Sequence, residues 1–121
     1  MNAVMRPQTL AQVAIDADFD LALREFLDEA VKGDVSARIS EEPALTGNDV
    51  RDAFLAAVAE TLAVGAGLGV PAWAQKPERF LRDRAWFAGG LESLKSTLLV
   101  ESPPAFRRRL LFVSRNALSR A

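Results

Sequence analysis

The sequence predicts an all-α fold: a single compact domain of five to seven helices, several of them short, around a central alanine-rich helix. Apolar residues recur three and four positions apart in several segments, and the strict alternation that marks a β-strand is missing. The chain has 121 residues, 50% of them hydrophobic and 26% charged, which suits one globular domain over residues 1–121. Residues 1–6 precede the first helical pattern, so we expect them to form a disordered tail.

Capping residues and apolar spacing predict the first two helices. Thr9 is a suitable N-cap for a short helix with Leu10, Val13 and Ala14 on one face. The acidic run Asp16, Asp18, Asp20 opens the second helix, because carboxylates favour the free N–H groups and positive dipole at a helix start. Gly33 ends this helix, whose apolar stripe consists of Phe19, Leu23, Phe26, Leu27 and Ala30.

The longest helix is predicted in the middle of the chain. A short helix over 34–42 ends at Pro43, and either Thr46 or Asn48 then starts a helix that runs to about Val64. Alanines on all its sides allow other helices to approach closely, so this helix should be the central one. Its apolar face comprises Val50, Phe54, Ala57, Val58, Thr61 and Leu62.

In the remaining, nearly second half of the chain, glycines and prolines interrupt the helical patterns more often. Glycines at 65, 67 and 69 end the long helix, and Pro71 and Pro77 limit the next stretch to short helical turns. Leu91, Leu94 and Leu98 mark another helix, and Pro103 starts the last one. Residues 110–113 fit either a helix or a short extended piece, with an antiparallel strand pair near Leu110–Val113 as the main alternative. We expect a core of Phe19, Leu23, Phe26, Phe54, Val58, Leu62, Leu94 and Leu98.

The composition argues against catalysis. The chain has no cysteine and no histidine, which removes disulfides, thiolate metal sites, the usual zinc ligand and the commonest general base. The spacing Asp16-x-Asp18-x-Asp20 resembles a calcium loop, but leucines stand where that loop needs glycine and glutamate. No serine has the lysine base of an S-x-x-K motif. We therefore expect no enzyme activity, no cofactor and no metal.

The cellular setting follows from the same residues. The longest apolar stretch, 62–74, contains three glycines and Pro71 and is shorter than the roughly 20 residues that cross a bilayer. The first residues do not form a secretory signal, because Arg6 and Pro7 interrupt them. We expect a cytoplasmic protein with no membrane partner.

Charge is divided unevenly between the two halves. Residues 1–60 hold twelve acidic and five basic side chains, a balance of −7, and residues 61–121 hold four acidic and ten basic, a balance of +6. Two interpretations are open. The halves pair with each other inside one fold, or they present oppositely charged faces to different partners.

Partner-binding candidates come from the second half. Three consecutive helical arginines spread over about 200°, so at least one should pair with the acidic half while the others contact a partner. The aromatic cluster at 73–87 is more simply a part of the core, although tryptophans on short turns can also contact a partner. The candidates are Arg107, Arg108, Arg109, Arg115, Trp73 and Trp86.

Three stretches resemble a family of small, mostly uncharacterised bacterial proteins. They are TLAQVAIDADFDLALREFLDE, VPAWAQKPERFL and, at the end, ESPPAFRRRLLFVSRNALSR, together about half of the chain. The looser loop at Gly65 to Gly69 and the pair Leu110-Leu111 depart from the family pattern. Proteins of this kind are often encoded beside minimal nucleotidyltransferase-like proteins, in the arrangement of a toxin and its antitoxin. No catalytic residues come with the resemblance.

The expected function is protein binding. The resemblance implies an antitoxin-like or accessory role toward a partner encoded nearby, such as a nucleotidyltransferase-like toxin, with no homo-oligomeric state implied. The alternative is a small nucleic-acid-binding regulator that uses the basic C-terminal half. Salt separates the two, because phosphate-driven binding weakens steeply as salt rises and a hydrophobic protein interface does not.

Overall fold

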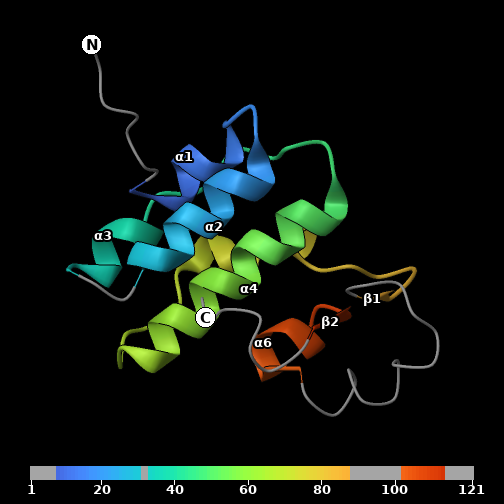
Figure 1. The fold of residues 1–121 in the computed structure, drawn as a ribbon. Helices are drawn as coiled ribbons and strands as arrows, with labels where there is room; N and C mark the ends of the chain where they lie inside the picture. The colour runs from blue at the N-terminus through green and yellow to red at the C-terminus, as the bar shows by residue number, and fades with distance from the viewer. Residues whose placement is uncertain (1–7, 31–32, 88–101, 114–121) are drawn as a thin grey trace.

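The computed structural model describes residues 8–30, 33–87 and 102–113. These form five α-helices, two 3-10 helices and one pair of two-residue strands, so the predicted all-α class is confirmed (Figure 1). None of the helices in these ranges is both long and apolar enough to cross a membrane. The expected tail at 1–6 and the expected helix with Leu94 and Leu98 lie outside the described residues.

Side-chain caps set the starts of the first helices as predicted. Helix α1 spans Leu10–Ala14, and the hydroxyl of Thr9 accepts a hydrogen bond from the Gln12 N–H at 3.2 Å. The Gln12 side chain accepts from the Thr9 N–H in return, which completes a capping box. Helix α2 spans Phe19–Glu29, and Asp18 caps it by accepting from the Leu21 N–H. The aspartate run is therefore helix-capping, as the sequence indicated.

The next two helices also begin at side-chain caps. Helix α3 spans Val35–Ile39 behind the cap Asp34, and helix α4 spans Asp49–Gly65 behind the cap Asn48. Of the two predicted starts for the long helix, Asn48 is the correct one, because its side chain accepts from two backbone N–H groups of the first turn. Thr46 instead donates to the buried carboxylate of Asp52 at 2.8 Å, which holds the loop before α4.

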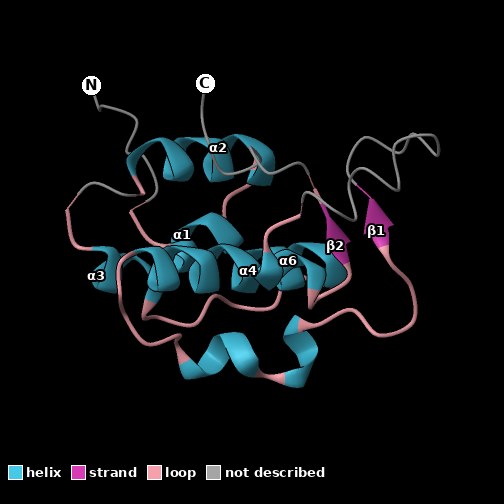
Figure 2. Ribbon diagram, turned by 90° about the horizontal axis from the view of Figure 1, so that it is seen from below, coloured by secondary structure: helices cyan, strands magenta, loops and turns pink. Residues whose placement is uncertain are grey.

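Helix α4 is the centre of the fold, as predicted. Figure 2 shows it between α2 on one side and the 3-10 helices η1 (Ala72–Gln75) and η2 (Pro77–Arg79) on the other. Helices α1 and α3 and the short helix α6 (Pro104–Arg107) also contact it. This close approach is possible because the inward positions are small, namely Ala53, Ala56, Ala57, Ala59 and Ala63, all fully buried.

The core prediction was partly right. Three of the expected core side chains are buried: Phe19, Phe26 and Val58. Three others only pack against the core and stay partly exposed: Leu23, Phe54 and Leu62. Most of the fully buried positions of α4 are alanines, whereas its larger residues Phe54 and Leu62 lie at the edge of the core. Leu94 and Leu98 lie outside the described residues.

The strand pair near the end of the chain is parallel, which corrects the antiparallel alternative. Strand β1 (Trp86–Phe87) pairs with β2 (Leu111–Phe112), with Trp86 opposite Leu111. Residues 88–110 connect them, and a connection of that length permits parallel pairing where a hairpin would not. Leu110 has a φ of 63°, a left-handed conformation that is costly for leucine, at the turn between α6 and β2. Its carbonyl accepts from the Trp86 N–H at 2.9 Å.

Candidate protein-binding site

Arg109, one of the predicted partner contacts, is fully buried. Its guanidinium donates to the Glu60 carboxylate at 2.7 Å and to the carbonyl oxygens of Ala105 and Ala74 at 2.9 and 2.7 Å. It also lies over the Phe80 ring, 4.3 Å from the centroid. Arg109 therefore joins α6, α4 and η1 inside the molecule. Its role is internal, which corrects the prediction of a partner contact.

The Glu60 carboxylate forms ion pairs with two arginines. Arg108 donates to both carboxylate oxygens from the exposed side, and Arg109 donates from the buried side. Burial alone would raise the pKa of Glu60, but the hydrogen bonds from Arg109 and Arg108 outweigh it and hold that pKa below its usual value. Burial in turn lowers the pKa of Arg109, with Glu60 opposing the shift. Two of the three consecutive arginines thus pair with the acidic half, as expected for at least one.

A second buried arginine, Arg79, was not singled out from the sequence as an internal group. It donates to the carbonyl oxygen of Pro43 and lies 3.4 Å from a carboxylate oxygen of Glu42. Its guanidinium lies over the Trp73 ring at 5.0 Å, and the Trp73 indole donates to the Ile39 carbonyl at 2.9 Å. Trp73 is only 5% exposed, so it belongs to the core and not to a partner surface. That corrects the second of the predicted contacts.

Part of the charge imbalance is resolved inside the fold. Within the described residues, five basic side chains of the second half form ion pairs, and the carboxylates in these pairs all belong to the first half. The pairs are Lys76–Glu42, Arg79–Glu42, Arg84–Asp49, Arg108–Glu60 and Arg109–Glu60. Hydrogen bonding to Glu42 raises the pKa of Lys76, as expected for a paired cation. Internal pairing, the first of the two interpretations of the charge pattern, is therefore confirmed for these residues.

The other predicted contacts are more accessible. Arg107 is exposed and forms no ion pair within the described part of the chain. Arg108 is exposed but engaged by Glu60. Trp86 is half-buried, and Arg115 lies outside the described residues. The structure therefore does not gather the five described candidates into one surface.

Trp86 instead lines a groove between the first turns of α2 and α4, which we call the α2–α4 groove. The groove has a volume of about 810 Å³ and is bounded on one side by α2 and on the other by α4 and the residues before β1. The side chains used below are Phe19, Asp20, Leu23, Arg51, Phe54 and Trp86. Phe19, Leu23 and Phe54 were predicted to be core residues, and only Phe19 is buried; Leu23 and Phe54 stay partly exposed in the groove.

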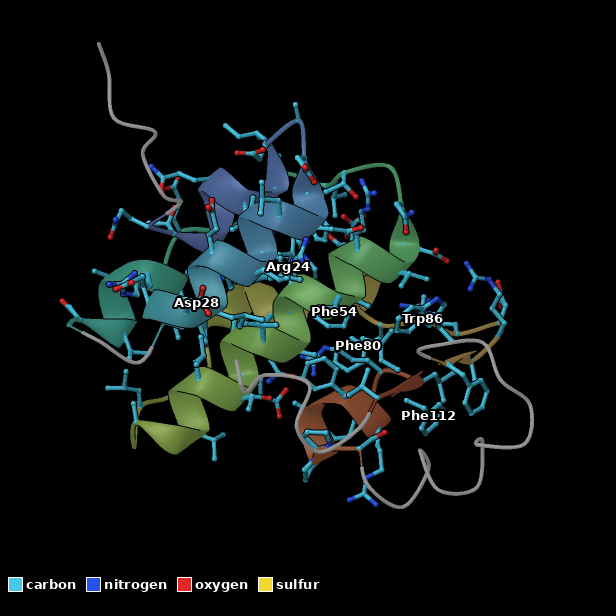
Figure 3. All side chains as sticks on the ribbon, viewed as in Figure 1. Arg24, Asp28, Phe54, Phe80, Trp86 and Phe112 are labelled. Carbon is cyan, nitrogen blue, oxygen red and sulfur yellow. The ribbon has the colours of Figure 1, made fainter. Side chains whose placement is uncertain are left out.

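Aromatic rings form the apolar floor of the groove. The Phe54 and Trp86 rings meet edge to face, with centroids 6.4 Å apart, and Figure 3 shows them side by side. Phe54 also packs edge to face on the buried Phe106 at 5.0 Å. The half-buried pair is thus fixed from below by the core. Such a floor offers a rigid apolar surface with a low entropic cost of binding.

Charged side chains form the rim. Arg51 lies over the Phe19 ring, 4.7 Å from its centroid, and the exposed pair Arg84–Asp49 is joined at 2.9 Å. Asp20 lines the α2 side. In the described ranges no three acidic side chains converge into a metal-binding group. The groove therefore offers apolar contact surrounded by charge, which is suited to binding a polypeptide segment.

Known proteins give no further guide. No family model, no curated protein and no solved structure matches the chain.

Proposed function

We propose that the chain is a non-catalytic protein-binding module, antitoxin-like or accessory to a partner encoded nearby, and that the α2–α4 groove contacts this partner. The half-buried pair Phe54 and Trp86 in the groove supports the proposal best. Half-buried aromatic side chains with a polar rim are typical of the centres of protein interfaces, where tryptophan contributes most. The resemblance adds the kind of partner, a nucleotidyltransferase-like toxin, and a complex in the cytoplasm.

The nucleic-acid alternative has less support. Phosphate binding needs a set of free cations on one face, and five basic side chains of the C-terminal half are already paired with carboxylates. Two of them, Arg79 and Arg109, are fully buried. Among the described cations of that half, only Arg82 and Arg107 are exposed without an ion pair.

The experiment compares tagged wild-type protein with Trp86→Ala and with the matched surface control Glu41→Gln, each used to purify partners from the native host. Glu41 is exposed and lies outside the groove. A partner that binds through the groove should remain with wild type and Glu41→Gln and bind Trp86→Ala about 10-fold or more weakly. Circular dichroism must first show that the variants are folded.

Two results would contradict the proposal. A partner that binds Trp86→Ala as well as wild type does not use the groove. A purified sample that binds a DNA or RNA duplex, with affinity falling steeply as salt rises, would favour the nucleic-acid alternative instead.

A further inference from the structure

A second cavity lies beside the start of α4, on the side of η2. It has a volume of about 640 Å³ and is bounded by the loop before α4, by the first turn of α4 and by residues 77–84. We call it the Asp52 cavity. Its apolar wall includes Phe80 and Leu45, and the Leu45 side chain is 54% exposed. Such a wall is suited to contact with an aliphatic chain.

One buried carboxylate lines this cavity without a cation. Asp52 is 6% exposed, and its Oδ1 accepts hydrogen bonds from the N–H and from the hydroxyl of Thr46, both at 2.8 Å. Within the described part of the chain, no hydrogen bond reaches Oδ2 and no ion pair includes Asp52. Oδ2 is not enclosed in the interior, as the unbonded Nε atoms of Arg79 and Arg109 are, so it can be reached from the cavity.

The negative charge of Asp52 is not needed to hold the loop before α4. An asparagine side chain would accept the same two hydrogen bonds from Thr46 through its amide oxygen. A buried carboxylate without a partner lowers stability, and the start of α4 offsets only about half a charge. The buried guanidinium of Arg79 donates to the backbone carbonyl of Asp52 and forms its ion pair with Glu42. The carboxylate charge is therefore available to a cation that enters the cavity.

The other charged groups of the cavity add to its negative charge. Four carboxylates and two guanidinium groups line it, namely those of Asp49, Asp52, Glu78 and Asp83 and those of Arg82 and Arg84. Arg84 is paired with Asp49, which leaves three carboxylates against the single guanidinium of Arg82. Among the described residues these acids do not form a group that holds a metal ion. The lining thus favours an organic cation.

We infer that the Asp52 cavity binds a primary ammonium group on an aliphatic chain. The ammonium donates to Oδ2 of Asp52, and the chain packs along Leu45 and Phe80. A guanidinium fits less well, because its planar fork pairs with two carboxylate oxygens and Thr46 already occupies Oδ1. A free amine and the lysine side chain of a polypeptide share this chemistry. The inference goes beyond the proposed function and does not depend on the α2–α4 groove.

Titrations followed by amide NMR test the site with small probes. The Thr46 N–H is the reporter, because it donates to the carboxylate that receives the ammonium. The probes are pentylamine, its uncharged analogue pentanol, and the acetylated methylamides of lysine and of arginine. The proteins are wild type, Asp52→Asn, which keeps an acceptor for Thr46 and removes the charge, and Glu41→Gln. Glu41 is exposed and lies outside the cavity, so its variant is the matched control.

Pentylamine should shift the Thr46 signal of wild type and of Glu41→Gln to saturation. Asp52→Asn should bind it about 10-fold or more weakly, and pentanol should bind wild type about 10-fold or more weakly than pentylamine. The lysine probe should bind more tightly than the arginine probe, by about 3-fold or more. Tighter binding of the lysine probe than of pentylamine identifies a polypeptide as the source of the ammonium, and the reverse order identifies a free amine.

Three results would overturn the inference. The first is the absence of a saturable shift with either amine, and the second is equal binding of pentylamine by wild type and Asp52→Asn. The third is equal binding of pentanol and pentylamine to wild type, because the cavity would then select an apolar chain without regard to charge. This last comparison needs no variant, so the test holds even if Asp52→Asn does not fold.

Discussion

Removing the Glu60 carboxylate tests whether the buried arginine depends on it. In Glu60→Ala the guanidinium of Arg109, which is 0% exposed, loses its only negatively charged partner in the described part of the chain. Breaking a buried ion pair from one side costs about 3–5 kcal/mol. Arg109 keeps the carbonyl oxygens of Ala105 and Ala74, so we expect the lower end, about 3 kcal/mol.

Arg108→Ala is the matched control, because it removes a cation from the same carboxylate at the surface. The Arg108 side chain is 49% exposed, and exposed pairs contribute about 0–1 kcal/mol. The double variant Glu60→Ala/Arg109→Met removes both buried charges. It should be more stable than Glu60→Ala alone, because no uncompensated charge remains in the interior.

Urea denaturation followed by circular dichroism gives the free energy of unfolding of each variant. For a domain of about this size, a loss of 3 kcal/mol corresponds to a fall in Tm of roughly 12 °C. A cost of less than about 1 kcal/mol for Glu60→Ala, the value of a surface pair, would show that Arg109 does not depend on Glu60. The same conclusion would follow if Arg108→Ala cost as much as Glu60→Ala.

Three further predictions concern the pH dependence of stability, the cost of truncating core residues and the loop before α4. The folded-state pKa of Glu60 is lowered, so the stability that its ion pairs add is complete above the ordinary glutamate pKa of about 4.3 and is lost as pH falls below that value. The Tm difference between wild type and Glu60→Gln should therefore shrink on acidification, and an unchanged difference would contradict the pairing. Phe106→Ala should cost about 3–5 kcal/mol and half-buried Phe54→Ala clearly less, measured by urea unfolding, and the reverse order would show that Phe54 lies in the core. Asp52→Ala should cost about 1–3 kcal/mol by leaving the Thr46 N–H unpaired, and an unchanged Tm would mean that this loop does not depend on it.

Local features of the fold were predictable where the signal is local. The helix starts at Thr9, Asp18 and Asn48 were predictable, because an oxygen on a short side chain reaches the N–H groups of its own turn. The central position of α4 followed from its alanines. The parallel pairing of β1 and β2 was not predictable, because two residues per strand leave no period to detect.

The site was less predictable than the fold, because exposure depends on contacts between distant segments. Arg107, Arg108 and Arg109 look alike in the sequence, but one is exposed, one is paired at the surface and one is buried. Helix α6 ends at Arg107, so Arg108 and Arg109 lie in the turn that follows it, and the expected helical spread did not say which arginine is buried. Likewise, the sequence predicted short turns around both Trp73 and Trp86, but Trp73 lies in η1, donates to the Ile39 carbonyl and is buried, whereas Trp86 lies in β1 and is half-buried.

The ion pairs also bear on how the chain folds during its synthesis. The paired residues are 34 to 49 positions apart, and the carboxylate comes first in every pair. A nascent chain that has only reached Gly65 therefore carries α4 without the cations that pair with Asp49 and Glu60 and without the 3-10 helices that pack against it. Contacts of such long sequence separation form late, because the cost of closing large loops precedes the gain. We expect this small protein to fold as one cooperative unit after most of the chain has been made.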